Sequence, residues 1–272
     1  MTTDKKFSGT IVHLSDLHFS NRYPKKRLEK IIQKIEKIKP KYICITGDLI
    51  DSPLESKENL DPFFSFLNNL ATFAPCILIL GNHDLLEKWA YGKEYQEYLK
   101  KLKQISGVYC LRNEMLSFQD VCFYGYEVEE RKYHPENAYK EEVSKEILNT
   151  IKFPEDEKYH VLLLHSPNFL LGKQKKLKNC DLVLCGHNHD GLLFYPFTHT
   201  NWHFGVISPN KKLFPKNTRG WYPGKGEKPE FIINGGIIKL SKLSGPISAF
   251  NFLFPSILTE IIITNNKKSG KK

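Results

Sequence analysis

The sequence lacks several features that mark whole classes of protein. Its six cysteines occur singly, with no Cys-x-x-Cys pair. This excludes a zinc finger and a disulfide-rich secreted scaffold, and it indicates reduced cysteines in the core. No segment repeats at the period of a solenoid, so a stack of repeated units is also excluded. There is no basic stripe interleaved with aromatic residues of the kind that binds along a nucleic-acid strand.

Long apolar runs are absent as well. Residues 1–9 are polar and lead directly into the first predicted strand, so they contain no signal-peptide core. The apolar stretch at residues 246–255 is too short to span a bilayer, and it either covers a sheet or touches a lipid surface. We therefore predict a cytoplasmic protein without a transmembrane segment, and we leave peripheral membrane contact open as an alternative.

The composition is that of a globular protein with one core. With 272 residues and 40% hydrophobic content, the chain can bury a substantial interior. We predict a single domain over residues 1–264, followed by a basic, disordered tail at residues 265–272. The formal charge of +10 suits an anionic substrate or partner. However, the lysines are spread over amphipathic helices, where solvated helix faces explain them more simply.

Residues that bind metals or move protons directly follow five apolar runs. The central example is Gly81-Asn82-His83-Asp84, which follows the run at residues 76–80. A strand that ends in a glycine, a carboxamide, an imidazole and a carboxylate indicates a site rather than a simple turn. The other four runs lead to further candidates in the same way: Asp16 and His18 after residues 10–14, Asp48 after 42–45, His165 after 161–164, and His187 and His189 after 182–185.

These residues are expected to converge on one metal site. In α/β sheets the ligand crevice lies outside the carboxyl ends of the strands, where all five loops can meet. Asp16 and His18 are two residues apart on an extended segment, so their side chains share a face and can grip one ion together. Carboxylate, carboxamide and imidazole donors without a thiolate suit Mn²⁺, Fe or Zn²⁺, and the donors alone do not choose among these.

Hydrophobic periodicity predicts the elements between these motifs. Residues 127–139 are charged and irregular, so we expect a surface loop or a lid over the site there, with His134 exposed. Beyond His189, short β-prone pieces predict a second, largely antiparallel sheet packed on the first. The predicted helices cover residues 24–39, 61–72, 86–105, 140–151 and 168–176, and the further strands cover 108–111, 115–118, 121–126, 192–195, 202–207, 231–233 and 258–264.

In their order along the chain, the strand-end motifs resemble those of the calcineurin-like metallophosphoesterase superfamily. The motifs Asp16-x-His18, Gly47-Asp48, Gly81-Asn82-His83-Asp84, His165 and Gly186-His187-x-His189 span residues 16–189. The resemblance implies an α/β fold, a four-layer α-β-β-α sandwich of two mixed sheets. It also implies a binuclear centre, in which Asp16, His18 and His189 bind one metal ion, Asn82, His165 and His187 bind the other, and Asp48 bridges both.

The resemblance further implies a metal-dependent phosphohydrolase of the phosphodiesterase or pyrophosphatase type. Two divalent ions, with Mn favoured over Fe or Zn, would activate a bridging water that attacks an anionic phosphoester substrate. In the family, the histidine that matches His83 protonates the leaving group, and the aspartate that matches Asp84 orients that histidine. The sequence supplies both residues.

The second half of the chain is similar to a bacterial branch of this superfamily. That branch includes membrane- or wall-associated phosphoesterases and a UDP-diacylglucosamine pyrophosphatase. The similarity rests on Arg219-Gly-Trp-Tyr222 and on the turn Asn234-Gly-Gly236, whereas residues 190–191 depart from the branch's usual pair of glycines. Arginine suits phosphate and tyrosine suits stacking, so Arg219 and Tyr222 are candidate substrate-binding residues, with an ordinary loop as the alternative.

Two alternative functions stay open at this point. A metal-dependent nuclease would use the same centre and would fit the basic charge, although no stripe for a nucleic-acid strand is present. A non-catalytic binding scaffold could keep the fold, although every ligand position and the acid are retained. His199 and His203 flank Trp202 in a predicted loop, and we expect them to be incidental rather than metal ligands.

Overall fold

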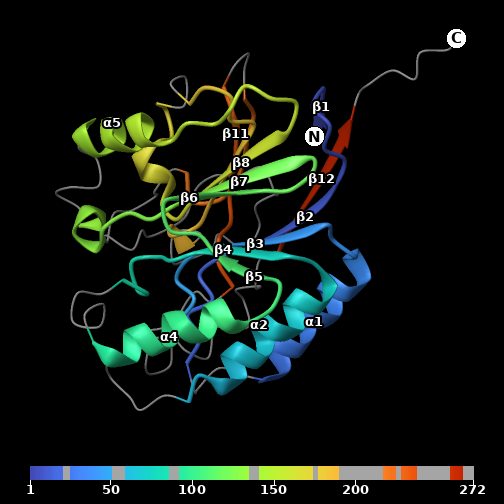
Figure 1. Cartoon of the computed structure of the whole chain (residues 1–272), viewed down its shortest axis with the longest axis vertical. Coiled ribbons are helices and arrows are strands. Elements are labelled where there is room, and N and C mark those ends of the chain that lie inside the picture. Colours follow the sequence, from blue (N-terminus) through green and yellow to red (C-terminus); the bar gives the residue numbers. More distant parts are fainter. Residues whose placement is uncertain are drawn as a thin grey trace, which may run out of the picture.

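Two six-stranded sheets with helices on their outer faces make up the protein (Figure 1). The structure is a computed structural model that describes residues 1–20, 25–50, 59–85, 92–134, 141–173, 177–189, 217–224, 228–237 and 258–265.

The first sheet has the strand order β1 (Thr2–Thr3), β12 (Thr259–Asn265), β2 (Gly9–Leu14), β3 (Tyr42–Thr46), β4 (Cys76–Ile79) and β5 (Val108–Cys110). Strands β2 to β5 run parallel, and β12 pairs antiparallel with β2. Every residue of β3 and β4 is buried. Burial on both faces explains why these strands read as continuous apolar runs rather than as alternating patterns.

The second sheet has the order β10 (Gly220–Tyr222), β11 (Glu230–Ile233), β9 (Leu182–Cys185), β8 (Tyr159–Leu164), β7 (Val121–Tyr126) and β6 (Glu114–Ser117). Its four central strands are parallel, and its two edge pairs are antiparallel. The prediction of a separate, largely antiparallel sheet after His189 is therefore wrong. Strand β11 extends the second sheet in parallel with β9, and β12 joins the first sheet, because a local pattern identifies a strand but not its partner.

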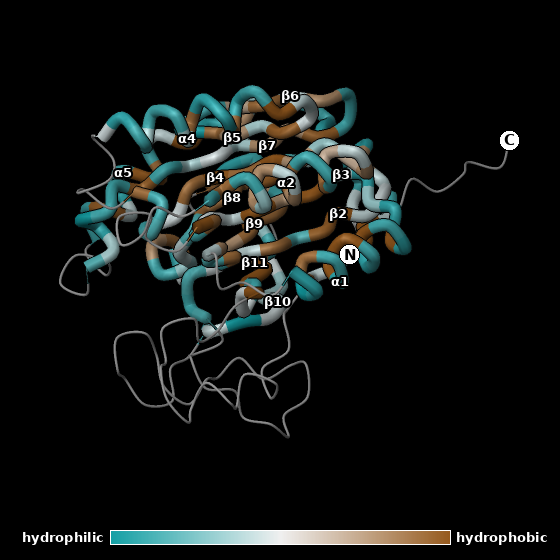
Figure 2. Tube along the Cα trace, turned by 90° about the horizontal axis from the view of Figure 1, so that it is seen from below, coloured by the Kyte–Doolittle hydropathy of each residue, from teal (hydrophilic) through white to brown (hydrophobic). Residues whose placement is uncertain are grey.

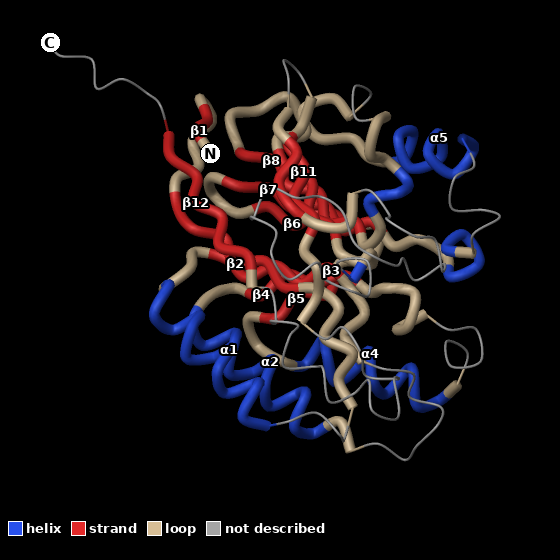
Figure 3. The backbone as a smooth tube through the Cα atoms, turned by 180° about the vertical axis from the view of Figure 1, so that it is seen from behind, coloured by secondary structure: helices blue, strands red, loops and turns tan. Residues whose placement is uncertain are grey.

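Helices cover the outer face of each sheet (Figures 1 and 3). Helix α1 shows the cause, because its buried Leu28, Ile31 and Ile35 recur at helical spacing and its lysines face solvent. Figure 2 shows the same division along the chain, with hydrophobic strands inside and hydrophilic residues on the helices. The first sheet carries α1 (Lys25–Ile38), α2 (Asp61–Phe73) and α4 (Lys93–Gln104), and the second carries α5 (Glu141–Thr150).

Three hydrophobic clusters separate the four layers. One lies between α1, α2, α4 and the first sheet, one between α5 and the second sheet, and one between the two sheets. In the cluster between the sheets, Ile11, Cys44 and Ile77 of the first sheet pack with Val161 and Leu182 of the second. The predicted four-layer α-β-β-α sandwich of two mixed sheets is thereby confirmed.

Of the helix predicted over residues 168–176, the structure describes residues 168–173, which form the 3-10 turn η2 (Pro167–Phe169) and a following turn rather than an α-helix. The hydroxyl oxygen of Ser166 accepts a hydrogen bond from the N–H of Asn168 at 3.4 Å and caps this turn. At Gly172 the backbone takes a φ of 90°, which only glycine adopts readily, so the helical pattern does not continue. The prediction was wrong because apolar residues in this segment pack onto the second sheet from a turn rather than from a helix.

No helix within the described ranges is long and apolar enough to cross a membrane.

Some predictions fall outside the described residues. Helix α4 begins at Lys93, and β12 includes Asn265, just past the predicted domain boundary. The strands predicted over 192–195 and 202–207, the apolar stretch 246–255, His199 and His203 all lie outside the described part of the chain.

At Gly125 in β7 the second sheet touches the first without room for a side chain. A Cβ atom at this position would overlap the Cβ of Leu111, and it would lie 2.8 Å from Cγ2 of Ile79 and 3.1 Å from the carbonyl oxygen of Leu111. Leu111 and Ile79 are themselves buried between the sheets, so neither can move aside at little cost.

We expect Gly125→Ala to lower the free energy of unfolding by about 1–3 kcal/mol, because an added methyl group in a packed core forces its neighbours apart. Urea denaturation followed by circular dichroism measures this change. A variant as stable as the wild type would show that the two sheets can separate at this point without cost.

Candidate metal centre

Five strand ends, three from the first sheet and two from the second, bring the predicted ligands together. Parallel strands present their carboxyl ends at one edge of a sheet, and here the edges of both sheets meet. Strand β2 leads to Asp16 and His18, β3 to Asp48, β4 to Asn82, β8 to His165, and β9 to His187 and His189.

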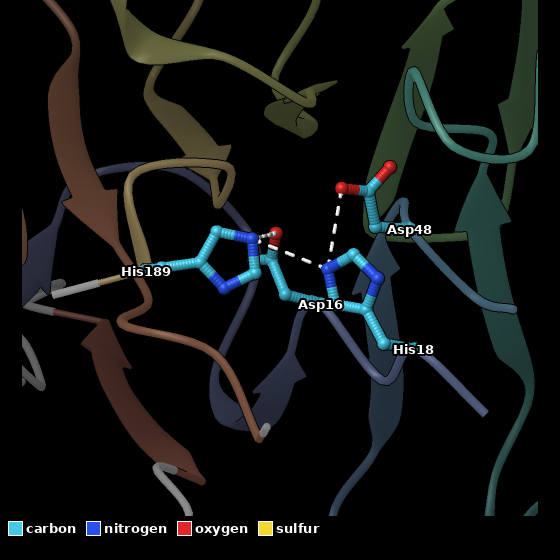
Figure 4. Close-up of side chains that lie close together, drawn as sticks. All are labelled: Asp16, His18, Asp48 and His189. Carbon is cyan, nitrogen blue, oxygen red and sulfur yellow. Dashed lines mark hydrogen bonds and ion pairs between the residues drawn. The ribbon is translucent and has the colours of Figure 1, made fainter. Parts of the chain in front are cut away.

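The first cluster that could hold a metal ion consists of Asp16, His18, Asp48 and His189. One potential ligand atom from each residue lies within 4.8 Å of all the others. The Nε2 atoms of His18 and His189 are 3.2 Å apart, and Nε2 of His189 is 3.4 Å from Oδ1 of Asp16 (Figure 4). Asp16, His18 and Asp48 are buried. Two carboxylates and two imidazoles that point at one volume form a suitable set of donors for a cation.

The second cluster consists of Asp48, His165 and His187. Nε2 of His165 lies 3.3 Å from Oδ2 of Asp48 and 3.2 Å from the side-chain oxygen of Asn82. The rings of His165 and His187 are edge to face, with their centroids 5.0 Å apart. Asn82 therefore lies beside this cluster with a neutral oxygen, and its role as a metal ligand stays a prediction.

Asp48 belongs to both clusters. Its Oδ1 accepts a hydrogen bond from the backbone N–H of His83 at 2.9 Å. Its Oδ2 receives no hydrogen bond from the described residues and lies 3.5 Å from Nε2 of His18 and 3.3 Å from Nε2 of His165. Burial raises the pKa of Asp48, but the neighbouring histidines, with His165 first, hold it well below its usual range. A charged carboxylate oxygen between two clusters suits a ligand that two ions share.

The backbone at the cluster residues is strained. Among the described residues, nine other than glycine have a positive φ, and five of these are ligand candidates, so the strain is concentrated at the site. A non-glycine residue in this region costs on the order of 1 kcal/mol. These five values are 51° at Asp16, 41° at His18, 49° at Asp48, 68° at His187 and 45° at His189.

Two glycines allow the loops after β3 and β4 to touch. Gly47 has a φ of 87°, and a Cβ atom there would lie 2.7 Å from both the backbone nitrogen of Gly81 and Nδ1 of His165. A Cβ atom at Gly81 would overlap the backbone nitrogen and Oδ1 of Asp48. Any larger residue at either position would push Asp48 away from the histidines.

Thr46 orients His165 in a way that the sequence did not reveal. Nδ1–H of His165 donates a hydrogen bond to the carbonyl oxygen of Thr46 at 2.6 Å, which leaves Nε2 facing the cluster. Burial lowers the pKa of His165, but Asp48, Asp16 and this carbonyl outweigh it and raise the pKa to about 9. Burial, followed by His165, holds the pKa of His187 well below its usual value. In the metal-free protein the second cluster therefore carries its proton on His165.

Asp84 fastens the loop that carries Asn82 and His83. Its carboxylate accepts hydrogen bonds from the backbone N–H groups of Leu49 at 3.1 Å, Ile50 at 3.2 Å and Gly81 at 2.8 Å. Burial, followed by the charge of Asp48, raises the pKa of Asp84 to about 7, and the three N–H donors oppose this shift. Asp84 thus ties the loop after β4 to the loop after β3.

Asn188 and Asn234, to which the sequence assigned no role, brace the two ends of the first cluster. The side-chain amide of Asn188 donates to the carbonyl oxygen of Asn217 at 2.7 Å. The amide of Asn234 donates to the carbonyl oxygen of His13 and to the hydroxyl of Thr259, both at 3.0 Å, and its oxygen accepts from Gly236 at 2.8 Å. The sequence motifs that contain both asparagines could be recognised, but only the tertiary contacts show which loops their side chains join.

The candidate substrate residues Arg219 and Tyr222 lie on a segment attached to the metal loop. Arg219 is two residues after Asn217. The carbonyl oxygen of Asn217 accepts a hydrogen bond from Asn188, which lies between His187 and His189 in the sequence. The hydroxyl of Tyr222 donates to the carbonyl oxygen of Arg219 at 3.3 Å. This places their segment beside the first cluster, and a substrate role for either residue stays a prediction. His134 is exposed, as expected.

A two-sheet α/β sandwich whose strand ends gather carboxylates and imidazoles defines a class of protein suited to binding metal ions. Residues 9–191 match the family model described as calcineurin-like phosphoesterase, so the chain belongs to this family of metal-dependent phosphoesterases. The sequence-based assignment is thereby confirmed at the level of the family.

Three relatives illustrate how far the similarity extends. An uncharacterized metallophosphoesterase of Aquifex aeolicus is 29% identical over 71% of this chain and 69% of its own length. One from Campylobacter jejuni is 31% identical over 69% of this chain, which spans only 45% of that protein. The UDP-2,3-diacylglucosamine pyrophosphatase LpxG of Chlamydia muridarum is 39% identical over 27% of this chain and 22% of its own length.

We expect Mn²⁺ binding to release protons and to tighten as the pH rises, because the cation must displace the proton on His165. The pKa of His165 is raised from 6.5 to about 9, so its proton stabilises the metal-free protein fully below pH 6.5, and this stabilisation is lost as the pH rises through about 9. Isothermal titration calorimetry in buffers of different ionisation enthalpy counts the released protons. Affinity that does not change with pH would contradict this expectation.

Proposed function

We propose that this chain is a binuclear-metal-dependent hydrolase of phosphodiesters or pyrophosphates. The position of Oδ2 of Asp48 carries the proposal, since it lies 3.5 Å from Nε2 of His18 in one cluster and 3.3 Å from Nε2 of His165 in the other. Paired ions in hydrolases are about 4 Å apart and share such a ligand. The oxygen and imidazole donors fit Mn²⁺, Fe or Zn²⁺, of which we favour Mn²⁺.

Divalent ions in the two clusters would neutralise phosphoryl oxygens and lower the pKa of a water molecule. The chain's own contribution is a rigid set of donors. Asp48 would serve both ions, and the loops that hold it are locked together by Gly47, Gly81 and Asp84. We assign Asp16, His18 and His189 to one ion and Asn82, His165 and His187 to the other.

We assign to His83 the protonation of the leaving group. Its ring lies edge-on to that of His18, with their centroids 4.7 Å apart, and it is partly exposed at the rim of the buried clusters. An imidazole beside the ligands can protonate an oxygen that departs from phosphorus. Asp84 positions His83 through the loop backbone, because its hydrogen bonds go to the N–H groups of Gly81, Leu49 and Ile50.

The proposed substrate is an anionic diester or pyrophosphate rather than a nucleic-acid strand. Arg219 would bind a second phosphoryl group, and Tyr222 would stack on an organic moiety. Both residues follow Asn217, which is hydrogen-bonded to Asn188, the residue between the candidate ligands His187 and His189. The similarity to the Chlamydia pyrophosphatase adds support for a nucleoside-diphosphate sugar.

We expect His83→Ala to lower kcat by about 10²- to 10⁴-fold, as is usual for the loss of a general acid, while bound metal stays unchanged. Steady-state kinetics and metal analysis by mass spectrometry measure the two effects. The loss should be smaller on a p-nitrophenyl ester, whose phenolate leaves without a proton. Equal losses on activated and unactivated esters would rule out proton donation by His83.

A substrate panel with the Mn²⁺-loaded protein tests the function itself. We expect turnover of bis(p-nitrophenyl) phosphate or of a nucleoside-diphosphate sugar, and little turnover of a phosphomonoester. Asp48→Asn, which removes the shared charge, is the control and should be inactive with less bound metal. Cleavage of single-stranded DNA alone would identify a nuclease, and two bound ions without turnover on any substrate would identify a scaffold.

A further inference from the structure

One aromatic residue outside the ligand set lies against the second cluster. The 3-10 turn η1 (Glu130–Tyr133) turns the ring of Tyr133 inward from the charged segment between β7 and α5. Its ring centroid is 5.2 Å from that of His187 and 5.7 Å from that of His165, and on another side it packs on Phe169 at 5.2 Å. Tyr133 is only 8% exposed.

The hydroxyl of Tyr133 is buried and has no hydrogen-bond partner among the described residues. Buried tyrosine hydroxyls usually find a partner, because an unsatisfied polar group costs free energy. Two tyrosines of the same layer show the ordinary case. The hydroxyl of Tyr124 donates to the carbonyl oxygen of Asn113 at 3.3 Å, and that of Tyr126 is hydrogen-bonded to Thr150.

The ring that carries this hydroxyl packs against both histidines of the second cluster. Burial raises the pKa of Tyr133 well above its usual value, and among the charged groups that add to this shift the carboxylate of Asp48 comes first. The two ring contacts place the phenol beside His165 and His187 of the second cluster. A phenylalanine would fill the same space without leaving a polar atom unpaired.

The turn that carries Tyr133 is anchored. Nζ of Lys132 forms ion pairs with Glu146 of α5 at 2.7 Å and with Glu129 at 3.4 Å, and the Lys132 side chain is only 15% exposed. Arg131 pairs with Glu129 as well. The phenol is therefore held in place by the second sheet's helix layer and does not depend on a substrate to position it.

We propose that the Tyr133 hydroxyl donates a hydrogen bond to a phosphoryl oxygen of the substrate bound on the His165 and His187 side of the centre. This inference rests on the proposed function. A neutral donor at this position adds a directional contact without adding charge to a cluster that already binds cations. It also explains why the polar atom is kept unpaired in the free protein, since its partner arrives with the substrate.

The test compares Tyr133→Phe with the matched control Tyr124→Phe in the full chain loaded with Mn²⁺. Inorganic phosphate is the probe, and calorimetry measures its binding. We expect Tyr133→Phe to bind the same amount of metal, to bind phosphate about tenfold more weakly, and to lose about tenfold or more in kcat/KM, as for the loss of one hydrogen bond to a charged group. Tyr124→Phe should change neither phosphate binding nor kcat/KM.

Thermal melting of the metal-free proteins adds a second readout with opposite signs. Tyr133→Phe should raise the melting temperature, because it removes an unpaired buried hydroxyl, and Tyr124→Phe should lower it, because it removes a paired one. Unchanged phosphate affinity in Tyr133→Phe, or a loss of bound metal, would overturn the inference. A wild-type protein that hydrolyses no ester would overturn the proposed function instead, and the phosphate-binding comparison would still decide the role of Tyr133.

Discussion

A single buried carboxylate, that of Asp48, sets the geometry of the whole centre. Its Oδ1 is held by the backbone of His83, and its Oδ2 faces a histidine of each cluster. A buried charge is costly unless neighbours of opposite charge or cations compensate it, and here the surrounding histidines do so. This requirement forces the loops after β3 and β4 into backbone contact. Positions 47 and 81 are glycines because a Cβ atom at either would overlap atoms of the other loop.

This arrangement requires positive φ angles at residues that follow the strands, which costs free energy. Carboxylates offset this cost by accepting hydrogen bonds from backbone N–H groups. The N–H of His187 donates to both oxygens of Asp16, at 3.1 and 3.0 Å. Asp84 accepts from Leu49 and Ile50 of the loop after β3 and from Gly81 of its own loop. The left-handed turns at His187 and Asp48 are therefore held by side chains from neighbouring loops, so backbone strain and site geometry are maintained together there.

The four layers were predicted through the resemblance of the strand-end motifs to a known family, and local patterns predicted that the candidate ligands lie together at strand ends. Each ligand directly follows a continuous apolar run, as Asp48 follows β3. Pairing is not local, so the partners of β11 and β12 were wrong. Thr46 acts through its backbone carbonyl, which leaves no trace in residue type. Tyr133 lies in a charged segment where nothing in the sequence indicates an inward ring.

The division of ligands between the two sheets has a mechanical consequence. Each cluster takes donors from both sheets, since Asp48 of the first sheet meets His189 in one cluster and His165 and His187 in the other. The sheets themselves are joined by apolar packing rather than by strand hydrogen bonds. A cation in either cluster would thus add a cross-link between the two sheets, so ion occupancy and the alignment of the sheets are thermodynamically linked.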